Sequence, residues 1–219
     1  MATPIGNLED ITLRALRVLK EVDAVLAEDT RVARKLLLHY RITKPVYSYY
    51  QHSGSAVTEN ILGMLAEQKD LALVTDAGTP GISDPGNKLI AEVIGRFGER
   101  VKIVPIPGSS AVTTIASIAG FNTDKFCFLG YPPAKKGRQT FFRKVAASDV
   151  PIILLESPHR IVKTLRQVQE VVGSDRRIVV GRELTKKFET IVRGPLAKVR
   201  TTIEQQKPLG EYTFIISAK

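Results

Sequence analysis

Five segments of the sequence combine polar side chains with residues that bend the backbone. They are ATPIGN (2–7), AEDTR (27–31), VTDAGTPGISDPG (74–86), PIPGSSA (105–111) and ESPHR (156–160). In the third segment, glycine or proline stands at positions 78, 80, 81, 85 and 86. These residues permit tight turns and a close approach of the main chain to a small molecule. One such segment would be an ordinary turn, but three in the first half of the chain indicate a ligand site.

Several widespread motifs are absent from the sequence. Without GxGxxG or a GxxxxGKS/T segment, a dinucleotide-binding fold and a P-loop nucleotide triphosphatase are both disfavoured. HExxH and GxSxG are missing as well. The histidines His39, His52 and His159 have no metal-ligand spacing among themselves or with Cys127, so we expect no metal site.

The first half of the chain alternates between strand-like and helix-like segments. Apolar and β-branched runs predict strands at 23–28, 44–50, 71–75 and 101–108, and helical spacing predicts helices at 31–40, 57–68, 87–98 and 109–120. This order predicts βαβ units and a parallel sheet that is covered on both faces. Ligands of such sheets lie beyond the carboxyl ends of the strands, where the bent segments stand.

A second series of elements follows the break GFNTD (120–124). Strands are predicted in KFCFLGY, VPIILLE, RRIVVGREL and GEYTFIIS, and helices in GRQTFFRKVAAS, in PHRIVKTLRQVQEVVG and near 195–206. We therefore place a domain boundary near Phe121, with one α/β domain over 1–120 and a second over 121–219.

The net charge of +10 is unevenly distributed along the chain. Residues 1–120 hold 13 basic and 13 acidic side chains, whereas residues 121–219 hold 19 basic and 9 acidic ones. An evenly spread charge would point to solubility alone. A neutral half joined to a basic half favours contact with a polyanion such as nucleic acid.

The compartment is also indicated by the sequence. Cys127 is the single cysteine, so a disulfide framework is excluded and a reducing cytoplasm is the simplest setting. No apolar run approaches the length that spans a bilayer. The start MATPIGNLED has neither the basic nor the apolar region of a signal peptide. We expect a cytoplasmic protein without membrane contact.

Six segments occur in a characteristic order: ATPIGNLEDIT, AEDTR, DAGTPGISDPG, PGSSA, ESPHR and RELTKKFET…RG. Together they resemble the S-adenosylmethionine-dependent tetrapyrrole methylase superfamily, and within it the branch of 16S rRNA (cytidine 2′-O)-methyltransferases. The resemblance covers essentially the whole chain. DAGTPGISDPG together with ESPHR separates this branch from the methylases of porphyrin precursors.

The resemblance implies a fold and an activity. The fold would be two α/β domains of the class III methyltransferase type, with a mainly parallel N-terminal sheet, a mixed C-terminal sheet and a cofactor cleft between the domains. The activity would be 2′-O-ribose methylation of a cytidine near the decoding centre, with S-adenosyl-L-methionine as the cofactor. The implied partners are 16S rRNA or the small ribosomal subunit, and a second copy of the chain in a homodimer.

The resemblance also implies cofactor contacts. By motif they are Pro4, Thr79, Gly81, Ile82, Ser110, Ala111 and Leu155. Because S-adenosylmethionine has no phosphate, the glycine- and proline-rich loop would offer it main-chain groups instead of a phosphate-binding loop. The helix start at Ser109–Ala111 would hold part of the cofactor through unpaired N–H groups.

The implied reaction requires a group that accepts the proton of a ribose hydroxyl. The candidates for catalytic roles are Glu28, Asp29, Arg31, His159, Arg160, Arg182, Glu183, Lys186 and Glu189. Asp29 or Thr30 would equally serve as the cap of the following helix. Lys186 and Lys187 would equally form a solvated charged face.

The segment PPAKKGRQTFFRK (132–144) interleaves basic and aromatic residues. Its predicted phosphate contacts are Lys135, Lys136, Arg138, Arg143 and Lys144. Phe141 and Phe142 are either core residues or a surface on which a base stacks, and we expect one of them to be exposed. Two alternatives remain open: a methyltransferase of the same fold that acts on a tetrapyrrole or another small molecule, and a non-catalytic rRNA-binding assembly factor.

Overall fold

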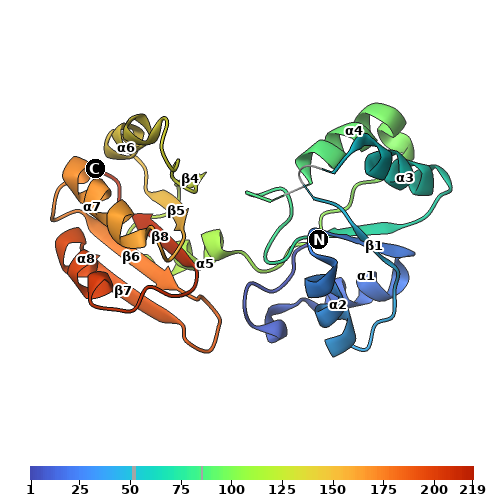
Figure 1. The fold of residues 1–219 in the computed structure, drawn as a ribbon, viewed down its shortest axis with the longest axis horizontal. Coiled ribbons are helices and arrows are strands. Elements are labelled where there is room, and N and C mark those ends of the chain that lie inside the picture. The colour runs from blue at the N-terminus through green and yellow to red at the C-terminus, as the bar shows by residue number, and fades with distance from the viewer. Residues whose placement is uncertain (51–52, 85) are drawn as a thin grey trace. The chain divides into compact units, whose positions relative to one another are not determined.

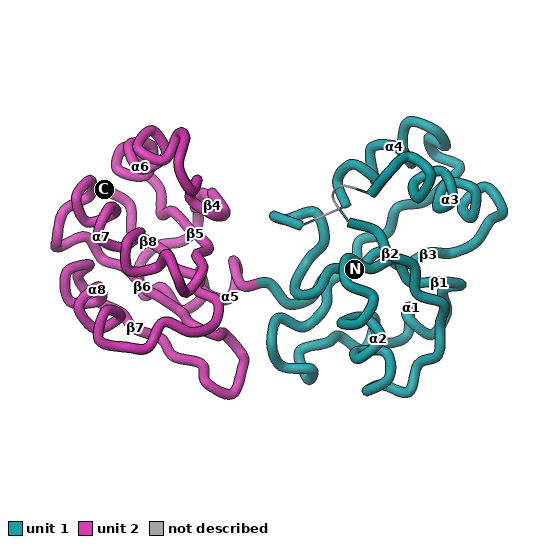
Figure 2. Tube along the Cα trace, viewed as in Figure 1, with its two compact units in different colours: residues 1–110 teal, residues 111–219 magenta. Residues whose placement is uncertain are grey.

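The computed structural model describes residues 1–50, 53–84 and 86–219, so His52 and Pro85 lie outside the described residues. The chain forms two units, Met1–Ser110 and Ala111–Lys219 (Figure 2). The division falls before α5 (Ala111–Ser117) and not near Phe121, because this helix packs on β6 (Arg177–Arg182) and β8 (Tyr212–Ile216) of unit 2. Residues 111–120 carry no charged side chain, so unit 1 is neutral and unit 2 carries the whole excess of +10.

Unit 1 is built on a three-stranded parallel sheet (Figure 1). The strands lie in the order β2 (Val46–Ser48), β1 (Ala24–Ala27) and β3 (Leu71–Val74). All four residues of the central strand β1 are buried, as expected for a strand with helices on both sides. The expected parallel sheet is confirmed.

Helices cover both faces of this sheet. They are α1 (Leu13–Glu21), α2 (Thr30–His39), α3 (Ser55–Ala66) and α4 (Asn87–Phe97), with 3-10 turns at Leu8–Asp10 and Gly98–Arg100. Alternate residues of β1 enter different cores: Val25 packs with Leu19 of α1 and Leu37 of α2. Leu26 packs with Ile61 of α3. The period of two along a strand therefore separates the two cores.

Two elements differ from the sequence prediction. The strand predicted over 101–108 is wrong, because this segment is irregular and its two prolines, Pro105 and Pro107, lack the N–H groups that a central strand needs. Helix α1 is additional to the predicted elements. Its start is capped by Thr12, whose hydroxyl accepts a hydrogen bond from the Ala15 N–H at 3.0 Å.

Unit 2 has a five-stranded mixed sheet (Figure 1). Its order is β4 (Cys127–Gly130), β5 (Ile152–Glu156), β8, β6 and β7 (Thr190–Pro195). Only the β4–β5 pair is parallel among the described strand pairs of this sheet, which confirms the expected mixed character.

The core of unit 2 lies between this sheet and three helices. These are α6 (Arg138–Ala146), α7 (Ile161–Val172) and α8 (Leu196–Glu204). Phe142, Leu165 and Val199 bring one side chain from each helix onto Leu154 and Phe214 of the sheet. Among the described residues of both units, we find no helix with the length and apolarity needed to span a bilayer.

Candidate functional site

The carboxyl ends of β1 and β3 bring two of the bent segments together. Ala27 pairs with Val74 in the parallel ladder, so the residues that follow them leave the sheet at the same edge. The Asp29 N–H donates a hydrogen bond to Asp76 Oδ1 at 3.0 Å. Segment AEDTR is thereby tied to the glycine- and proline-rich loop.

The N-terminal segment and the segment after α4 reach the same edge. Thr3 exchanges two main-chain hydrogen bonds with Gly78, at 2.9 and 3.1 Å. The Ala2 N–H donates to the Ile106 carbonyl at 3.0 Å, and the Thr79 hydroxyl donates to the Ser109 carbonyl at 3.5 Å. Four of the five bent segments therefore meet at the carboxyl edge of the unit 1 sheet, as the sequence predicted.

The loop conformation depends on glycine at position 81. Gly81 has a φ of +80°, and a Cβ atom there would lie 2.6 Å from Asn87 Oδ1. The Asn87 side-chain amide donates to the Gly81 carbonyl at 3.0 Å and so holds the loop against the start of α4. A side chain at 81 would disturb both contacts, which leaves this part of the loop as exposed main chain.

Three carboxyl groups lie near one another at this edge: Glu28, Asp76 and Asp84. Burial, followed by the charges of Glu28 and Asp76, raises the pKa of Asp84 to about 6. Burial and the charge of Asp76 raise the pKa of Glu28. Carboxylates that repel one another in this way are stabilised by a cationic ligand. Among residues 1–50, 53–84 and 86–219, we find no group of His, Cys, Asp and Glu arranged for a metal ion.

The sequence analysis named Glu28 but missed Asp76 and Asp84. Both stand in the quoted segment VTDAGTPGISDPG, so the signal was present. Their proximity to Glu28 follows only from the parallel pairing of β1 with β3, because Glu28 is far from both in the sequence.

The substitution Asp84→Asn is expected to stabilise unit 1 at neutral pH. The folded-state pKa of about 6 lies above the ordinary value of 3.8, so the folded protein binds this proton more tightly than the unfolded chain. Ionisation of Asp84 therefore lowers stability as the pH rises through this window. The melting temperature of Asp84→Asn should exceed that of the parent at pH 7.5, and the difference should shrink toward pH 4. A difference of constant size, or one equally present in Asp10→Asn at an exposed carboxylate, would contradict the assignment.

Asp29 acts as a helix cap. Its carboxylate accepts a hydrogen bond from the Arg31 N–H at 2.8 Å and pairs with the Arg31 guanidinium. This contact with Arg31 lowers the pKa of Asp29 to about 2. The capping interpretation is confirmed, and a carboxylate with such a low pKa is a weak proton acceptor.

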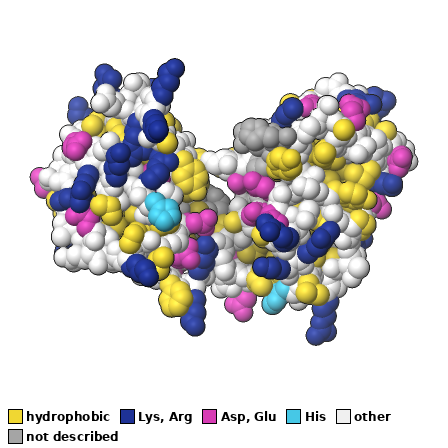
Figure 3. All heavy atoms as spheres, in the orientation of Figure 1, with side chains coloured by type: hydrophobic (Ala, Val, Ile, Leu, Met, Phe, Trp, Pro, Cys, Tyr) yellow, Lys and Arg dark blue, Asp and Glu magenta, His cyan; other side chains and the backbone are white. Residues whose placement is uncertain are grey.

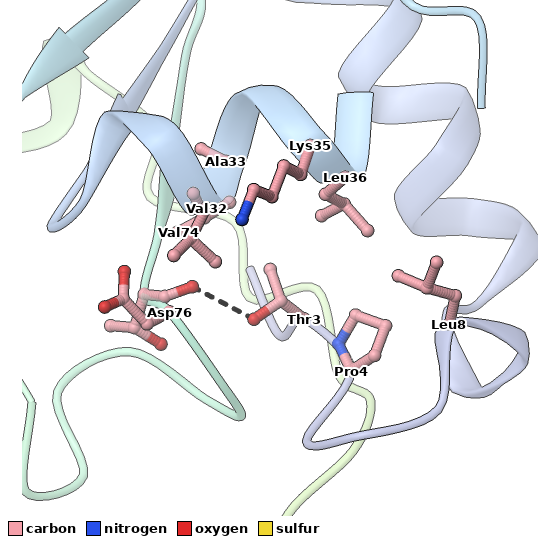
Figure 4. A pocket seen from close by; sticks show the side chains of 10 residues that line it. Thr3, Pro4, Leu8, Val32, Ala33, Lys35, Leu36, Val74 and Asp76 are labelled. Carbon is pink, nitrogen blue, oxygen red and sulfur yellow. Dashed lines mark hydrogen bonds between the residues drawn. The ribbon is translucent and has the colours of Figure 1, made fainter. Parts of the chain in front are cut away.

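A pocket of about 280 Å³ lies next to these segments in unit 1 (Figure 4). It is lined by Thr3, Pro4, Leu8, Val32, Ala33, Lys35, Leu36, Val74, Thr75 and Asp76. Figure 4 shows Pro4 and Leu8 on one side, Leu36 of α2 on another, and the Thr3 hydroxyl bonded to the end of β3. Pro4, a predicted cofactor contact, therefore lines a largely apolar pocket.

The other predicted cofactor contacts occupy different settings. Thr79 is half-buried, whereas Ile82 is 51% exposed. Ser110 is the last residue of unit 1, and Ala111 begins α5 of unit 2. Leu155 lies in β5 and pairs with Thr213 of β8. Their contact with a cofactor stays a prediction.

In unit 2, the segment ESPHR begins with a buried carboxylate. Glu156 is 1% exposed and accepts hydrogen bonds from the Thr164 hydroxyl at 2.6 Å and from the Ser157 N–H at 2.8 Å. Arg160 Nε lies 3.3 Å from Glu156 Oε1, and its guanidinium also donates to the Pro132 carbonyl. Arg160, a catalytic candidate, is thus engaged in holding the 131–138 segment.

The prediction that Arg138 contacts phosphate is wrong. Arg138 is 7% exposed. Its guanidinium donates to Gln167 Oε1, to the Pro133 carbonyl and to Thr164 Oγ1, at 2.7, 2.9 and 2.7 Å. It also lies over the Phe142 ring, 4.9 Å from the centroid. A guanidinium with this many internal partners is part of the core and cannot face RNA.

The catalytic candidates of segment RELTKKFE brace a loop. Lys186 Nζ lies 2.9 Å from a carboxylate oxygen of Glu183 and 2.9 Å from one of Glu211. Burial alone would lower the pKa of Lys186, but the hydrogen bonds and charges of the two glutamates outweigh it and raise the pKa. Lys186 is therefore protonated at neutral pH and is no proton acceptor. Glu189 accepts a hydrogen bond from the Thr185 N–H at 2.6 Å.

The remaining predicted phosphate contacts lie on the surface of unit 2. Lys135, Lys136, Arg143 and Lys144 are all exposed. Figure 3 shows Lys and Arg side chains gathered over the part of unit 2 that contains α6 and α7. Phe142 is 3% exposed, and Phe141 is half-buried against the same core. The expectation that one of the two rings is exposed is therefore wrong.

Comparisons with known proteins agree with the motifs. The sequence profile of the family described as Tetrapyrrole (Corrin/Porphyrin) Methylases matches residues 2–200. A Thermotoga maritima protein named Ribosomal RNA small subunit methyltransferase I is 42% identical over 100% of this chain and 97% of its own length. A Synechocystis protein of the same name is 42% identical over 99% of this chain and 77% of its own length.

Two solved structures share the fold. A cobalamin biosynthetic enzyme, cobalt precorrin-4 methyltransferase, superposes with a TM-score of 0.70 and 19% identity, over 99% of this chain and 92% of its own. The methyltransferase CobJ superposes with a TM-score of 0.69 and 19% identity, over 97% and 90% of the two chains. Such low identity concerns the fold alone. The family resemblance seen in the six segments is confirmed by the profile and by the relatives, and this chain belongs to the tetrapyrrole (corrin/porphyrin) methylase family.

Proposed function

We propose that this protein transfers a methyl group from S-adenosyl-L-methionine to the 2′-oxygen of a cytidine in 16S rRNA. The observation that carries the proposal is the 42% identity, over the whole chain, to a relative named Ribosomal RNA small subunit methyltransferase I. The choice of cytidine and of a position near the decoding centre follows from the resemblance of the six segments. The reaction takes place where ribosomes are assembled, which is the bacterial cytoplasm.

The carboxyl edge of the unit 1 sheet fits the proposed cofactor. S-adenosylmethionine carries positive charge on its sulfonium and its amino group, and the carboxyl groups of Glu28, Asp76 and Asp84 lie together at this edge. The bent loop at Gly81 presents main-chain groups in place of side chains. When bound, the cofactor supplies an electrophilic methyl group and a neutral thioether as the leaving group.

Glu28 is the proton acceptor that the electrostatics of the site favour. Of the acidic candidates, Asp29 has a lowered pKa, and Glu183 is lowered as well because Lys186 and Glu211 outweigh the effect of its burial. The pKa of Glu28 is raised by burial and by Asp76. A carboxylate with a raised pKa is the stronger base toward a hydroxyl proton.

Methyl transfer to isolated rRNA and to small ribosomal subunits tests the function. With a radiolabelled methyl donor, label should enter 16S rRNA at one cytidine of particles from cells that lack this protein. Label in a porphyrinogen and none in rRNA would support the small-molecule alternative. RNA binding without heat of cofactor binding would support the assembly factor. The homodimer, which is also proposed, is tested by sedimentation of the purified chain.

Gly81→Ala is expected to weaken cofactor binding about tenfold. An alanine at φ +80° adds about 1–2 kcal/mol of backbone strain, and its Cβ would collide with Asn87. The loop must then move away from the position that exposes its main chain. Calorimetry with S-adenosylmethionine measures the change. Gly95→Ala in α4, where a Cβ meets nothing within 4 Å, should bind like the parent. Equal affinity of all three proteins would remove the loop from the site.

Neutralising Lys135 and Lys136 is expected to weaken RNA binding and its dependence on salt. Each lost phosphate contact on a single strand makes the log–log salt slope about 0.7 less negative, so the double variant to glutamine should shift it by about 1.4. Filter binding at several salt concentrations gives the slope. Lys20→Gln with Lys102→Gln removes two exposed charges from the neutral unit 1 and should leave the slope unchanged. Identical slopes in the two double variants would contradict the assignment.

A further inference from the structure

The loop between β6 and β7 exposes an aromatic ring. Phe188 is 68% exposed, the largest exposed fraction among the large apolar side chains in the described part of unit 2. Figure 1 shows this loop projecting from the end of the β6–β7 hairpin. An aromatic side chain that stands so far out of the core gains little from folding, because most of its apolar surface stays in water.

The same loop is held in one conformation. Lys186 bridges Glu183 and Glu211, and the Glu183 N–H donates to the Glu211 carbonyl at 2.9 Å. Glu183 and Thr185 both have left-handed backbone, with φ of +51° and +67°, which is uncommon for residues other than glycine. An unusual backbone with several polar contacts indicates a loop whose shape is specified, so the ring of Phe188 is presented in a defined place.

The charge around the ring indicates what it meets. Lys187 is exposed, and its ammonium lies 5.7 Å from the centroid of the Phe188 ring. Unit 2 as a whole carries 19 basic and 9 acidic side chains. This charge repels a second copy of the same unit and attracts a polyanion. An aromatic ring beside a cation is the combination that binds single-stranded nucleic acid, through base stacking and phosphate contact.

We propose that Phe188 is a stacking platform for an unpaired base of the substrate RNA, with Lys187 contacting a neighbouring phosphate. The inference rests on the proposed function for the identity of the RNA. It assigns to Glu183, Lys186 and Glu189 the task of holding the platform in place. It also explains how this protein has a stacking ring although Phe141 and Phe142 are committed to the core.

A fluorescence experiment tests the contact directly. The chain has no tryptophan, so Phe188→Trp provides a single indole at the proposed platform. A short single-stranded RNA of mixed sequence should quench its emission, and the same sequence as a duplex should quench it much less. Leu38→Trp places an equally exposed indole in unit 1, because Leu38 is 78% exposed, and its emission should not change. Unchanged emission of Phe188→Trp, while filter binding shows saturation, would overturn the proposal.

Substrate kinetics separate stacking from a general structural role. Phe188→Ala should raise Kd for single-stranded RNA and KM for the rRNA substrate about tenfold, with kcat and the salt slope unchanged. Phe188→Tyr should restore affinity, and Lys187→Gln should make the slope about 0.7 less negative. Full affinity in Phe188→Ala would refute stacking even where methyl transfer is intact. Absence of methyl transfer in the parent would refute the proposed function and leave the binding result standing. A change of oligomeric state with unchanged RNA affinity would assign the ring to a second copy and overturn the proposal.

The brace has its own test in a pair of glycines. A Cβ at Gly210 would lie 2.3 Å from Glu183 Cδ, so Gly210→Ala should displace this carboxylate from Lys186. Gly173→Ala imposes the same kind of left-handed backbone, but nothing lies within 4 Å of its Cβ. RNA affinity should fall in Gly210→Ala and stay at the parent value in Gly173→Ala. Equal affinities would refute a positioning role of the brace.

Discussion

Glu28→Gln is expected to lower kcat of methyl transfer about 100-fold, which is the size of effect that general bases contribute. Glutamine keeps the shape of the side chain but has no basic oxygen of comparable strength. Burial and the charge of Asp76 raise the pKa of Glu28, and this makes its carboxylate the most basic of the acidic candidates proposed for catalysis. Single-turnover measurement with saturating cofactor isolates the chemical step.

Two comparisons make this result specific. Asp29→Asn changes the neighbouring carboxylate, but asparagine also caps helices well, so kcat should stay within a few-fold of the parent. Cofactor affinity of Glu28→Gln should fall only a few-fold, since Asp76 and Asp84 remain to attract the cationic cofactor. A parent-like kcat in Glu28→Gln would mean that another group, or water, accepts the proton.

Glu156→Ala is expected to lower the free energy of unfolding by about 3–5 kcal/mol, because it removes one partner of a buried ion pair. Glu156 is 1% exposed and receives hydrogen bonds from Thr164 and Ser157. Burial and the nearby charge of Arg160 already lower the pKa of Arg138, and the charge of Glu156 opposes this shift. Without Glu156, the two guanidinium groups of Arg138 and Arg160 lose their shared counter-charge.

Urea unfolding followed by circular dichroism measures the effect. Glu156→Gln, which retains an acceptor oxygen without the charge, should be intermediate between the parent and Glu156→Ala. Glu204→Ala removes a glutamate that pairs with Arg166 and Arg200 near the surface, and its effect should be much smaller. If Glu156→Ala and Glu204→Ala unfold at the same urea concentration, the buried network contributes no special stability.

Stability and RNA binding are connected through this network. Arg138 and Arg160 donate to the carbonyls of Pro133 and Pro132, which immediately precede the exposed Lys135 and Lys136. The sequence analysis treated the basic residues of this segment as equivalent. The structure divides them into one that holds the segment in place from within and others that face solvent.

The sequence by itself determined the family, the order of most elements and the position of the main loop. Apolar runs such as LALV (71–74) predict buried strands, and glycine and proline predict bends, because both signals depend on residues that are close together in the chain. The six ordered segments were sufficient for the family, since each preserves a local combination of residue types.

Only the tertiary structure decided which charged residues are buried and which partners they have. Glu28 joins Asp76 and Asp84 through the pairing of β1 with β3, and Lys186 joins Glu211 across many residues of sequence. Arg138 and Lys136 differ little as sequence letters, yet one meets Thr164 in the core and the other meets water. The physical reason is that the free energy of a charge depends on its distance from other charges and from solvent, and folding sets those distances.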